Sequence, residues 1–155
     1  MSSETQSGPS PSFTPSLSDV EPGTARYLFA ISVLSESGTG RVTTGELREY
    51  LSVAPASVTE MFSKLDGRGF VEYEKYRGAT LTDRGESLAT EARWRFCVVS
   101  TFFDSVLGAA LDEETALEIS FALPEDGVFR LRDLVESECL NCCPEAEGGA
   151  ERCVA

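Results

Sequence analysis

The 155-residue sequence predicts a mainly α-helical fold with one small β-hairpin. Apolar residues recur at helical spacing in three segments of the N-terminal half. Two short segments rich in β-branched and aromatic residues then flank a charged turn that contains glycine. A segment of about 24 residues with an apolar stripe follows, which is long enough for a helix that leaves the first domain.

The first two helices are predicted from their apolar spacing and their end signals. The first covers residues 22 to 36, with apolar side chains on one face, and Gly38 ends it. The second is expected from Thr44 to Leu51, because Thr43 and Glu46 form the two halves of a capping box.

A third helix and the hairpin complete the N-terminal domain. Pro55 suits the first position of a helix, and Gly67 marks the end of this one. Residues 70 to 73 and 79 to 81 are expected to pair around the turn EKYRG, in which Gly78 supplies any positive φ. This order of elements is that of a winged helix-turn-helix, so the third helix is the candidate recognition helix.

The second domain is expected to be helical and to dimerise. Thr82 caps the long helix, and a long helix with an aromatic stripe beside a small DNA-binding domain is typical of a dimer interface. We assign this interface to Val99, Phe102, Phe103 and Val106. Two shorter helices follow, the first starting at Asp112 and the second after Pro124.

The chain is therefore divided into four parts. Residues 1–21 form a disordered tail, because they are rich in Ser, Pro and Thr and have little apolar surface to offset the entropy of ordering. The other parts are the winged helix-turn-helix (22–85), the helical dimerisation domain (86–136) and an acidic, Cys-rich tail (137–155). Neither a signal peptide nor an apolar stretch of the roughly 18 to 20 residues of a membrane span is found, so we expect a soluble, cytoplasmic protein without membrane contact.

The net charge of −13 argues at first against a polyanionic partner, because such a partner requires local Lys and Arg. The charge is unevenly distributed, however. Residues 41 to 77 carry six basic and six acidic side chains, whereas residues 104 to 155 carry three basic and thirteen acidic ones. An acid-rich, lysine-poor composition is also typical of proteins that work in concentrated salt, so a halophilic source is a hypothesis.

Candidate DNA contacts lie on the third helix, on the hairpin turn and around the second helix. On the third helix, small side chains allow close approach to the major groove, and hydroxyl and carboxylate groups can bond base edges. These residues are Ala54, Ala56, Ser57, Thr59, Glu60 and Lys64. The turn adds Lys75, Tyr76 and Arg77. Arg41 and Arg48 add phosphate contacts. The alternative is a solvated surface used for protein contacts.

Four of the five cysteines lie in the C-terminal tail, at Cys139, Cys142, Cys143 and Cys153. In a reducing cytosol, clustered thiols indicate metal, an iron–sulfur cluster or redox switching sooner than structural disulfides. Four thiolates can complete a zinc site or hold a cluster, whereas spare thiols in a flexible tail are the alternative. Cys97, in an apolar stretch of the long helix, is expected to pack rather than to ligate.

The segment from Arg26 to Gly85 resembles the diphtheria toxin repressor family of iron- and manganese-dependent regulators. The phrases that carry the resemblance are RYLFAISVLSE and RVTTGELREYLSVAPASVTEMFSKLDGRGFVEYEKYRGATLTDRGE, and more weakly TFFDSVLG and LDEETALEISFALPED. The similarity extends over about residues 24 to 135. It implies a homodimer on a palindromic operator of double-stranded DNA, with two metal sites in the second domain that control DNA binding.

The positions that ligate metal in that family carry other side chains here. The resemblance places Arg26, Phe96, Ser100, Glu113, Leu117, Ser120 and Phe121 there. The chain has no histidine and only Glu113 keeps a ligating side chain, whereas Fe²⁺ and Mn²⁺ prefer several imidazole and carboxylate donors. We therefore expect a haloarchaeal-type member with degenerate iron and manganese sites.

Three functions remain open from the sequence. The first is a dimeric, sequence-specific DNA-binding regulator that senses redox state or a metal through its C-terminal thiols. The second is an iron- or manganese-dependent repressor with non-standard ligands, and the third is a protein-interaction module that heterodimerises with a related regulator. An enzyme is not expected, because no nucleophile–base pair, phosphate-binding glycine loop or pair of catalytic carboxylates can be located.

Overall fold

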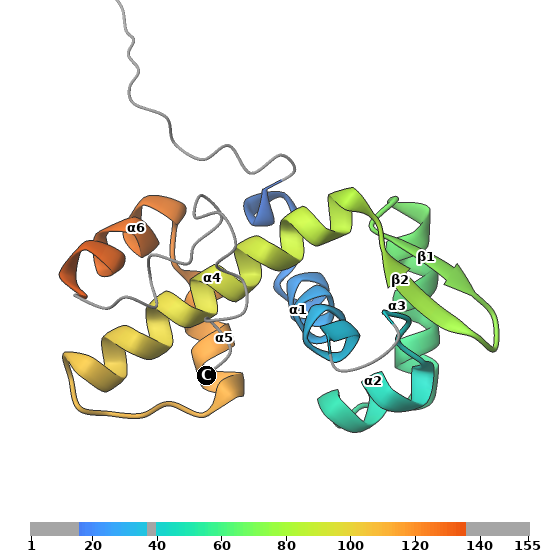
Figure 1. Ribbon diagram of the computed structural model, residues 1–155, viewed down its shortest axis with the longest axis horizontal. Helices are drawn as coiled ribbons and strands as arrows, with labels where there is room; N and C mark the ends of the chain where they lie inside the picture. Colours follow the sequence, from blue (N-terminus) through green and yellow to red (C-terminus); the bar gives the residue numbers. More distant parts are fainter. Residues whose placement is uncertain (1–15, 37–39, 136–155) are drawn as a thin grey trace, which may run out of the picture.

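The computed structural model describes residues 16–36 and 40–135, and its helices are arranged along one long helix (Figure 1). The elements are η1 (Leu17–Asp19), α1 (Pro22–Glu36), α2 (Thr44–Leu51), α3 (Pro55–Gly67), β1 (Val71–Glu74), β2 (Gly78–Leu81), α4 (Asp83–Ser105), α5 (Glu113–Ala122) and α6 (Glu125–Leu134). The predicted fold class is confirmed: the described part of the chain is mostly helical and contains one antiparallel hairpin.

The first three α-helices and the hairpin enclose one apolar core. Leu28 and Ile31 of α1 are fully buried in it, together with Leu47 of α2. Phe62 and Leu65 of α3 are also fully buried. Each such side chain contributes about 1.5–3 kcal/mol through its removal from water. The inner face of α3 is thereby fixed, which leaves its outer face available for contact with another molecule.

Local chemistry explains the ends of α2 and α3. The hydroxyl of Thr43 accepts a hydrogen bond from the Glu46 N–H at 3.2 Å, and the Glu46 carboxylate accepts one from the Thr43 N–H at 2.8 Å. The predicted capping box is therefore confirmed. Ser52, with φ of 55°, ends α2, and Pro55 opens α3 after a short connection.

The hairpin is held against the loop before α2. Its register runs from Val71 opposite Leu81 to Glu74 opposite Gly78. Gly78 has φ of +101°, and a Cβ at this position would collide with the backbone carbonyl of Val42. Both the conformation and the available space therefore require glycine here, in agreement with the sequence prediction.

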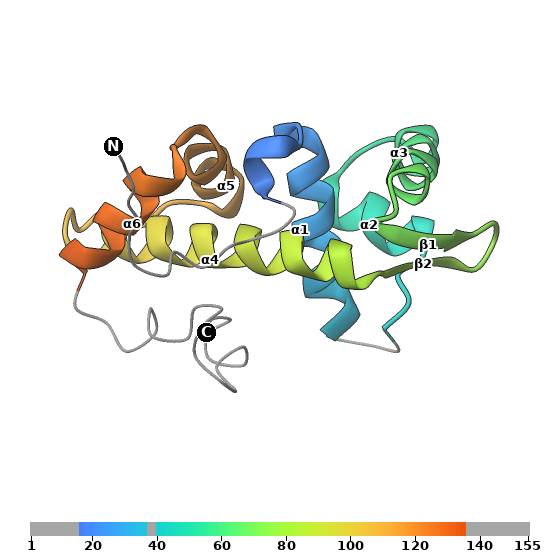
Figure 2. The same ribbon diagram turned by 90° about the horizontal axis from the view of Figure 1, so that it is seen from above.

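The long helix α4 joins the two halves of the molecule. Thr82 caps it by accepting a hydrogen bond from the Gly85 N–H at 3.2 Å. The first half of α4 packs on α1 and β2 and the second half on α5 and α6 (Figure 2). A smaller apolar cluster between α4 and α6 includes Trp94, Val98 and Val128. Over the described ranges, no helix has the length and apolar character needed to cross a membrane.

The segment before α1 departs from the sequence interpretation. Residues 16 to 21 are part of the fold rather than of a disordered tail, and residues 1–15 lie outside the described residues. Leu17 is buried, and its N–H donates to the Glu91 carboxylate at 2.9 Å. The prediction is wrong for these residues because the partner of Leu17 lies 74 positions away, beyond the reach of local composition.

Candidate nucleic-acid interface

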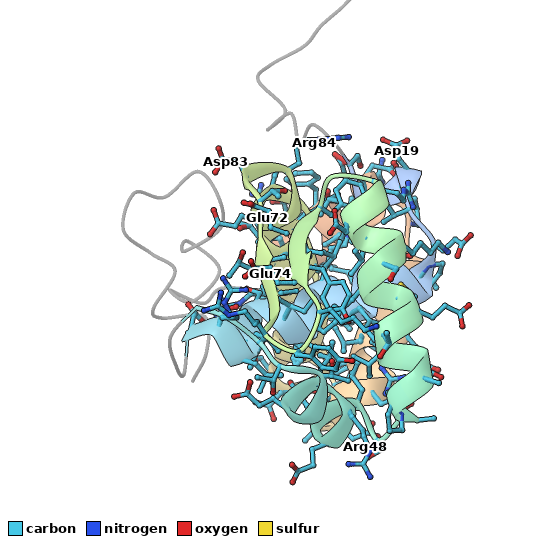
Figure 3. The ribbon with its side chains drawn as sticks, turned by 90° about the vertical axis from the view of Figure 1, so that its right-hand side faces the viewer. Asp19, Arg48, Glu72, Glu74, Asp83 and Arg84 are labelled. Carbon is cyan, nitrogen blue, oxygen red and sulfur yellow. The ribbon has the colours of Figure 1, made fainter. Side chains whose placement is uncertain are left out.

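The outer face of α3 and the hairpin turn lie on the same side of the molecule, and together they form the candidate DNA-binding face (Figure 3). Its exposed residues are Ala54, Ala56, Ser57, Thr59, Glu60, Lys64, Lys75, Tyr76 and Arg77. Tyr76 at the tip of the turn is 93% exposed. The structure therefore brings together the candidates from α3 and from the turn, which are up to 23 positions apart in the sequence (Ala54 to Arg77).

The two hydroxyl groups near the start of α3 differ in their availability. The Thr59 hydroxyl donates to the Pro55 carbonyl within the helix at 3.1 Å. Ser57 is exposed, and its side chain makes no hydrogen bond to the described residues. Ser57 is therefore the better placed of the two to bond a base edge or a phosphate.

Three basic side chains on or beside this face are paired with carboxylates of the same chain. The Glu74 carboxylate lies 3.2 Å from a guanidinium nitrogen of Arg41 and 3.7 Å from one of Arg77. The Lys64 ammonium contacts the Glu21 carboxylate at 3.0 Å. The arginines and the lysine are therefore held in place before any partner arrives, and a phosphate would compete with these carboxylates.

Two arginines beside this face are absent from the sequence prediction. Arg68 and Arg84 both lie over the Phe70 ring, at 5.1 Å and 5.2 Å from its centroid. Figure 3 shows Arg84 at the edge of the face opposite Arg48 of α2. Arg84 could have been singled out from the sequence because it lies in the first turn of α4, where the helix dipole disfavours a cation.

Comparisons with known proteins agree with this geometry. Residues 20–79 match the family model described as the iron dependent repressor, N-terminal DNA binding domain. The HTH-type transcriptional regulator MntR of Lysinibacillus sphaericus is 36% identical over 108 residues, which cover 67% of this chain and 74% of that protein. An uncharacterised HTH-type transcriptional regulator of Methanocaldococcus jannaschii is 33% identical over 114 residues, which cover 71% of this chain and 90% of that protein. The chain belongs to the diphtheria toxin repressor family.

The fold of this family member also matches solved structures. A structure of the manganese regulator SloR superposes with a TM-score of 0.64 at 26% identity, covering 74% of this chain and 54% of that one. The chain thus spans about half the length of that regulator. The curated relatives are transcriptional regulators and not enzymes, in line with the sequence prediction.

At several positions where the family resemblance implies metal ligands, the side chains are packed inside the protein instead. The Phe96 ring packs on the Phe29 ring of α1, with 5.2 Å between centroids. Leu117 is buried in the main core and Phe121 packs against it. The buried Ser120 hydroxyl donates to the Leu117 carbonyl at 2.8 Å, so its proton is used within α5.

The charged side chains of this region are engaged with other partners. Arg26 forms an ion pair with Glu114 at 3.3 Å, and the Tyr50 hydroxyl lies 2.8 Å from both carboxylate oxygens of Glu113. Within the described residues, no group of three or more His, Cys, Asp or Glu side chains is placed to hold a metal ion. Fe²⁺ and Mn²⁺ take several carboxylate or imidazole ligands, whereas among the family positions only Glu113 carries such a group, and it is bonded to Tyr50.

The predicted thiol site consists of cysteines in the C-terminal segment of the sequence. Cys139, Cys142, Cys143 and Cys153 lie outside the described residues, so the thiol site stays a prediction. Cys97 is buried in the smaller apolar cluster, as predicted.

A buried ion pair connects several elements in the second half of this family member. The Arg95 guanidinium contacts the Glu91 carboxylate at 3.1 Å and donates to the carbonyls of Ser120 at 3.0 Å and Leu123 at 2.8 Å. Burial raises the pKa of the Glu91 carboxyl, and the hydrogen bond from Leu17 and the charge of Arg95 oppose this effect. This pair joins η1, α4 and the end of α5, and it makes no contact with the DNA-binding face.

The predicted dimer residues lie near the end of α4. Val99 is fully buried within the chain itself, so it has no surface to offer to a second copy. Phe102 and Phe103 are half-buried, with their rings 5.8 Å apart. Val106 is 49% exposed and the adjacent Leu107 is 56% exposed. We call Phe102, Phe103, Val106 and Leu107 the α4 patch.

Proposed function

We propose that this chain is a sequence-specific, DNA-binding transcriptional regulator that acts in the cytoplasm as a homodimer on a palindromic operator. The observation that carries the proposal is the exposed, small-residue face of α3 beside the hairpin turn with its basic residues. In a winged helix-turn-helix, such a helix enters the major groove while the turn reaches the backbone or the minor groove.

The exposed residues of α3 supply the chemistry for reading bases. Ala54 and Ala56 are small enough for close approach and can contact thymine methyl groups. Ser57 can bond a phosphate or a base edge, and Glu60 can accept from a cytosine amine. Sequence preference is therefore assigned to α3, and affinity to the arginines and lysines around it.

The homodimer is proposed to form through the α4 patch. Two consecutive exposed apolar side chains, Val106 and Leu107, continue from the half-buried rings of Phe102 and Phe103. Contact with a second copy would remove this apolar surface from water. Two-fold symmetry would then present two α3 helices to half-sites about 34–36 Å apart.

The signal is proposed to be redox state or a metal bound by Cys139, Cys142, Cys143 and Cys153. The engagement of Glu113 and Glu114 with Tyr50 and Arg26 supports the loss of iron and manganese sensing at the family positions. An iron- or manganese-dependent repressor with other ligands would need a donor set away from these residues.

A protein-interaction module is the second candidate, and one observation favours it. Arg41, Arg77 and Lys64 are all paired with carboxylates of the chain, so three cations on or beside the face are partly neutralised. Such a module would bind a related regulator and show no salt-dependent affinity for duplex DNA.

The test is selection of duplexes from a random-sequence library, followed by fluorescence anisotropy of the selected duplex over a range of salt concentrations. Lys75→Ala with Arg77→Ala should weaken binding and reduce the slope of log K against log salt by about one for each phosphate that the variant no longer neutralises. Arg130→Ala with Arg132→Ala on α6 is the matched control and should leave the slope unchanged. A wild-type chain that binds no duplex would overturn the proposal. Binding that is identical with oxidant, chelator or added zinc would remove the sensing part.

A further inference from the structure

The start of α5 is linked by side chains to two helices of the DNA-binding half. The Tyr50 hydroxyl, near the end of α2, donates to the Glu113 carboxylate, with both oxygens at 2.8 Å. The next residue, Glu114, forms an ion pair with Arg26 of α1 at 3.3 Å. Adjacent carboxylates on one helix thus contact two different helices of the other half.

The start of α5 is itself well defined. The Asp112 carboxylate caps the helix by accepting from the Thr115 N–H at 2.9 Å. The same carboxylate accepts from the Thr115 hydroxyl at 2.9 Å. Glu113 and Glu114 therefore begin the first turn in a fixed direction, where carboxylates are also favoured by the helix dipole.

The groups around Tyr50 leave its hydroxyl as a donor to Glu113. Burial raises the pKa of Tyr50, and the bond to Glu113 raises it further, so the hydroxyl stays protonated in neutral solution. The nearby cation Arg93 is engaged by the Glu36 carboxylate at 2.7 Å and by the Ser32 hydroxyl at 3.2 Å.

We propose that Tyr50 and Arg26, bonded to Glu113 and Glu114, are positioning residues that set the direction of α3 relative to the second half of the chain without a bound metal. This inference rests on the proposed function as a dimeric DNA reader. We call these four residues the α5 latch.

The packing of the elements carries the effect of the latch to α3. Because α2 and α3 share one core through Leu47, Leu51 and Phe62, fixing α2 also fixes α3. The other side of the latch, α5, packs on α4, and the end of α4 carries the α4 patch. The latch therefore sets how two α3 helices are held in a dimer. Correct spacing of α3 matters for a duplex with two half-sites and not for a single half-site.

The experiment compares two DNA duplexes selected by the wild-type chain, one with both half-sites and one with the second half-site scrambled. Tyr50→Phe should bind the two-site duplex about tenfold more weakly, as expected for loss of one hydrogen bond to a charged acceptor, with single-site affinity unchanged. Tyr50→Phe combined with Glu113→Gln should cause no additional loss, because both remove the same contact. Glu114→Gln should weaken two-site binding through the second contact.

Matched controls separate the latch from charge and folding. Glu118→Gln removes an exposed carboxylate from the same helix, and Tyr27→Phe removes a tyrosine hydroxyl from α1. Both should bind the two duplexes as the wild-type chain does. Equal weakening of the two duplexes by Tyr50→Phe, or no weakening, would overturn the latch.

The latch is also testable without DNA. Amide hydrogen exchange along α2 should be faster in Tyr50→Phe than in Tyr27→Phe. If the wild-type chain bound no duplex, the proposed function would fail and this exchange measurement alone would decide whether the latch holds α2. Equal exchange rates in the two variants would overturn the latch in either case.

Discussion

Glu74 holds two basic side chains beside the hairpin turn, and replacing it with glutamine should strengthen binding to duplex DNA. Its carboxylate lies 3.2 Å from Arg41 and 3.7 Å from Arg77. A phosphate that approaches either guanidinium group competes with this carboxylate for its positive charge and its N–H donors. Glutamine has nearly the same shape as glutamate and no charge. The substitution therefore removes the negative charge that competes with phosphate and leaves the conformation of the hairpin turn unchanged.

The size of the effect follows from the exposure of the pairs. The Glu74 side chain is 52% exposed and that of Arg77 is 71% exposed, so solvent screens both ion pairs. Two such pairs are together worth about 1 kcal/mol, which corresponds to a gain of roughly fivefold in affinity at low salt. At about 1 M salt the Debye length falls to about 3 Å, and the gain should shrink to less than about twofold.

The assay is fluorescence anisotropy on a duplex of arbitrary sequence at several salt concentrations. Glu72→Gln is the matched control, because Glu72 lies exposed on the same strand and forms no ion pair with the described residues (Figure 3). An equal gain from both variants would show that general repulsion matters and that the contacts of Glu74 do not. No gain from Glu74→Gln would refute the competition between carboxylate and phosphate.

Four other changes test the hairpin, the buried ion pair, the dimer and the response to metal. Gly78→Ala should lower the free energy of unfolding by about 2–4 kcal/mol in urea titrations, through positive φ and a backbone collision, whereas Gly67→Ala, in open space, should change it little. Burial raises the pKa of Glu91 above its unfolded value, so between these two values the native state holds a proton that the unfolded state has lost. The free energy of unfolding should therefore fall as pH rises through that window, and Glu91→Gln should flatten this part of the profile. Leu107→Glu should convert a dimer into a monomer in light scattering, whereas Leu134→Glu, at an exposed position on α6, should not. Excess Mn²⁺ should leave the melting temperature unchanged, and a rise with Mn²⁺ concentration would reveal binding to the native state.

Local signals were sufficient to predict most of the helical boundaries. The second helix was expected from Thr44 to Leu51, and α2 has these bounds. The reason is that Thr43 and Glu46 satisfy each other within one turn, so the signal needs no distant partner. The conformation of Gly78 was predictable for a similar reason, because a tight turn between two strands demands it.

Contacts between distant residues were not predictable in this way. The bond between Leu17 and Glu91 joins positions 74 apart, and the bond between Tyr50 and Glu113 joins positions 63 apart. Neither pair has a periodic or compositional signature. The sequence pattern around a polar side chain on a helix is the same whether that side chain forms a hydrogen bond with water or with another part of the protein. The sequence therefore showed that family ligand positions had changed, and it gave no indication that Glu113 contacts Tyr50.

The pairing of charges in the DNA-binding half was also not predictable from the sequence, and it affects the expected affinity for DNA. The neutrality from residue 41 to 77 was visible in the sequence, but a neutral segment can hold either separated or paired charges. The structure shows Arg41 and Arg77 both paired with Glu74. A duplex must offer phosphates that compete with these contacts, so binding to DNA of arbitrary sequence should be weak. Tight binding then requires the additional bonds to base edges that we propose for α3. The cost of breaking the internal ion pairs is the same for every duplex, so these pairs lower the affinity for all sequences and leave the ratio between a specific and an arbitrary sequence unchanged.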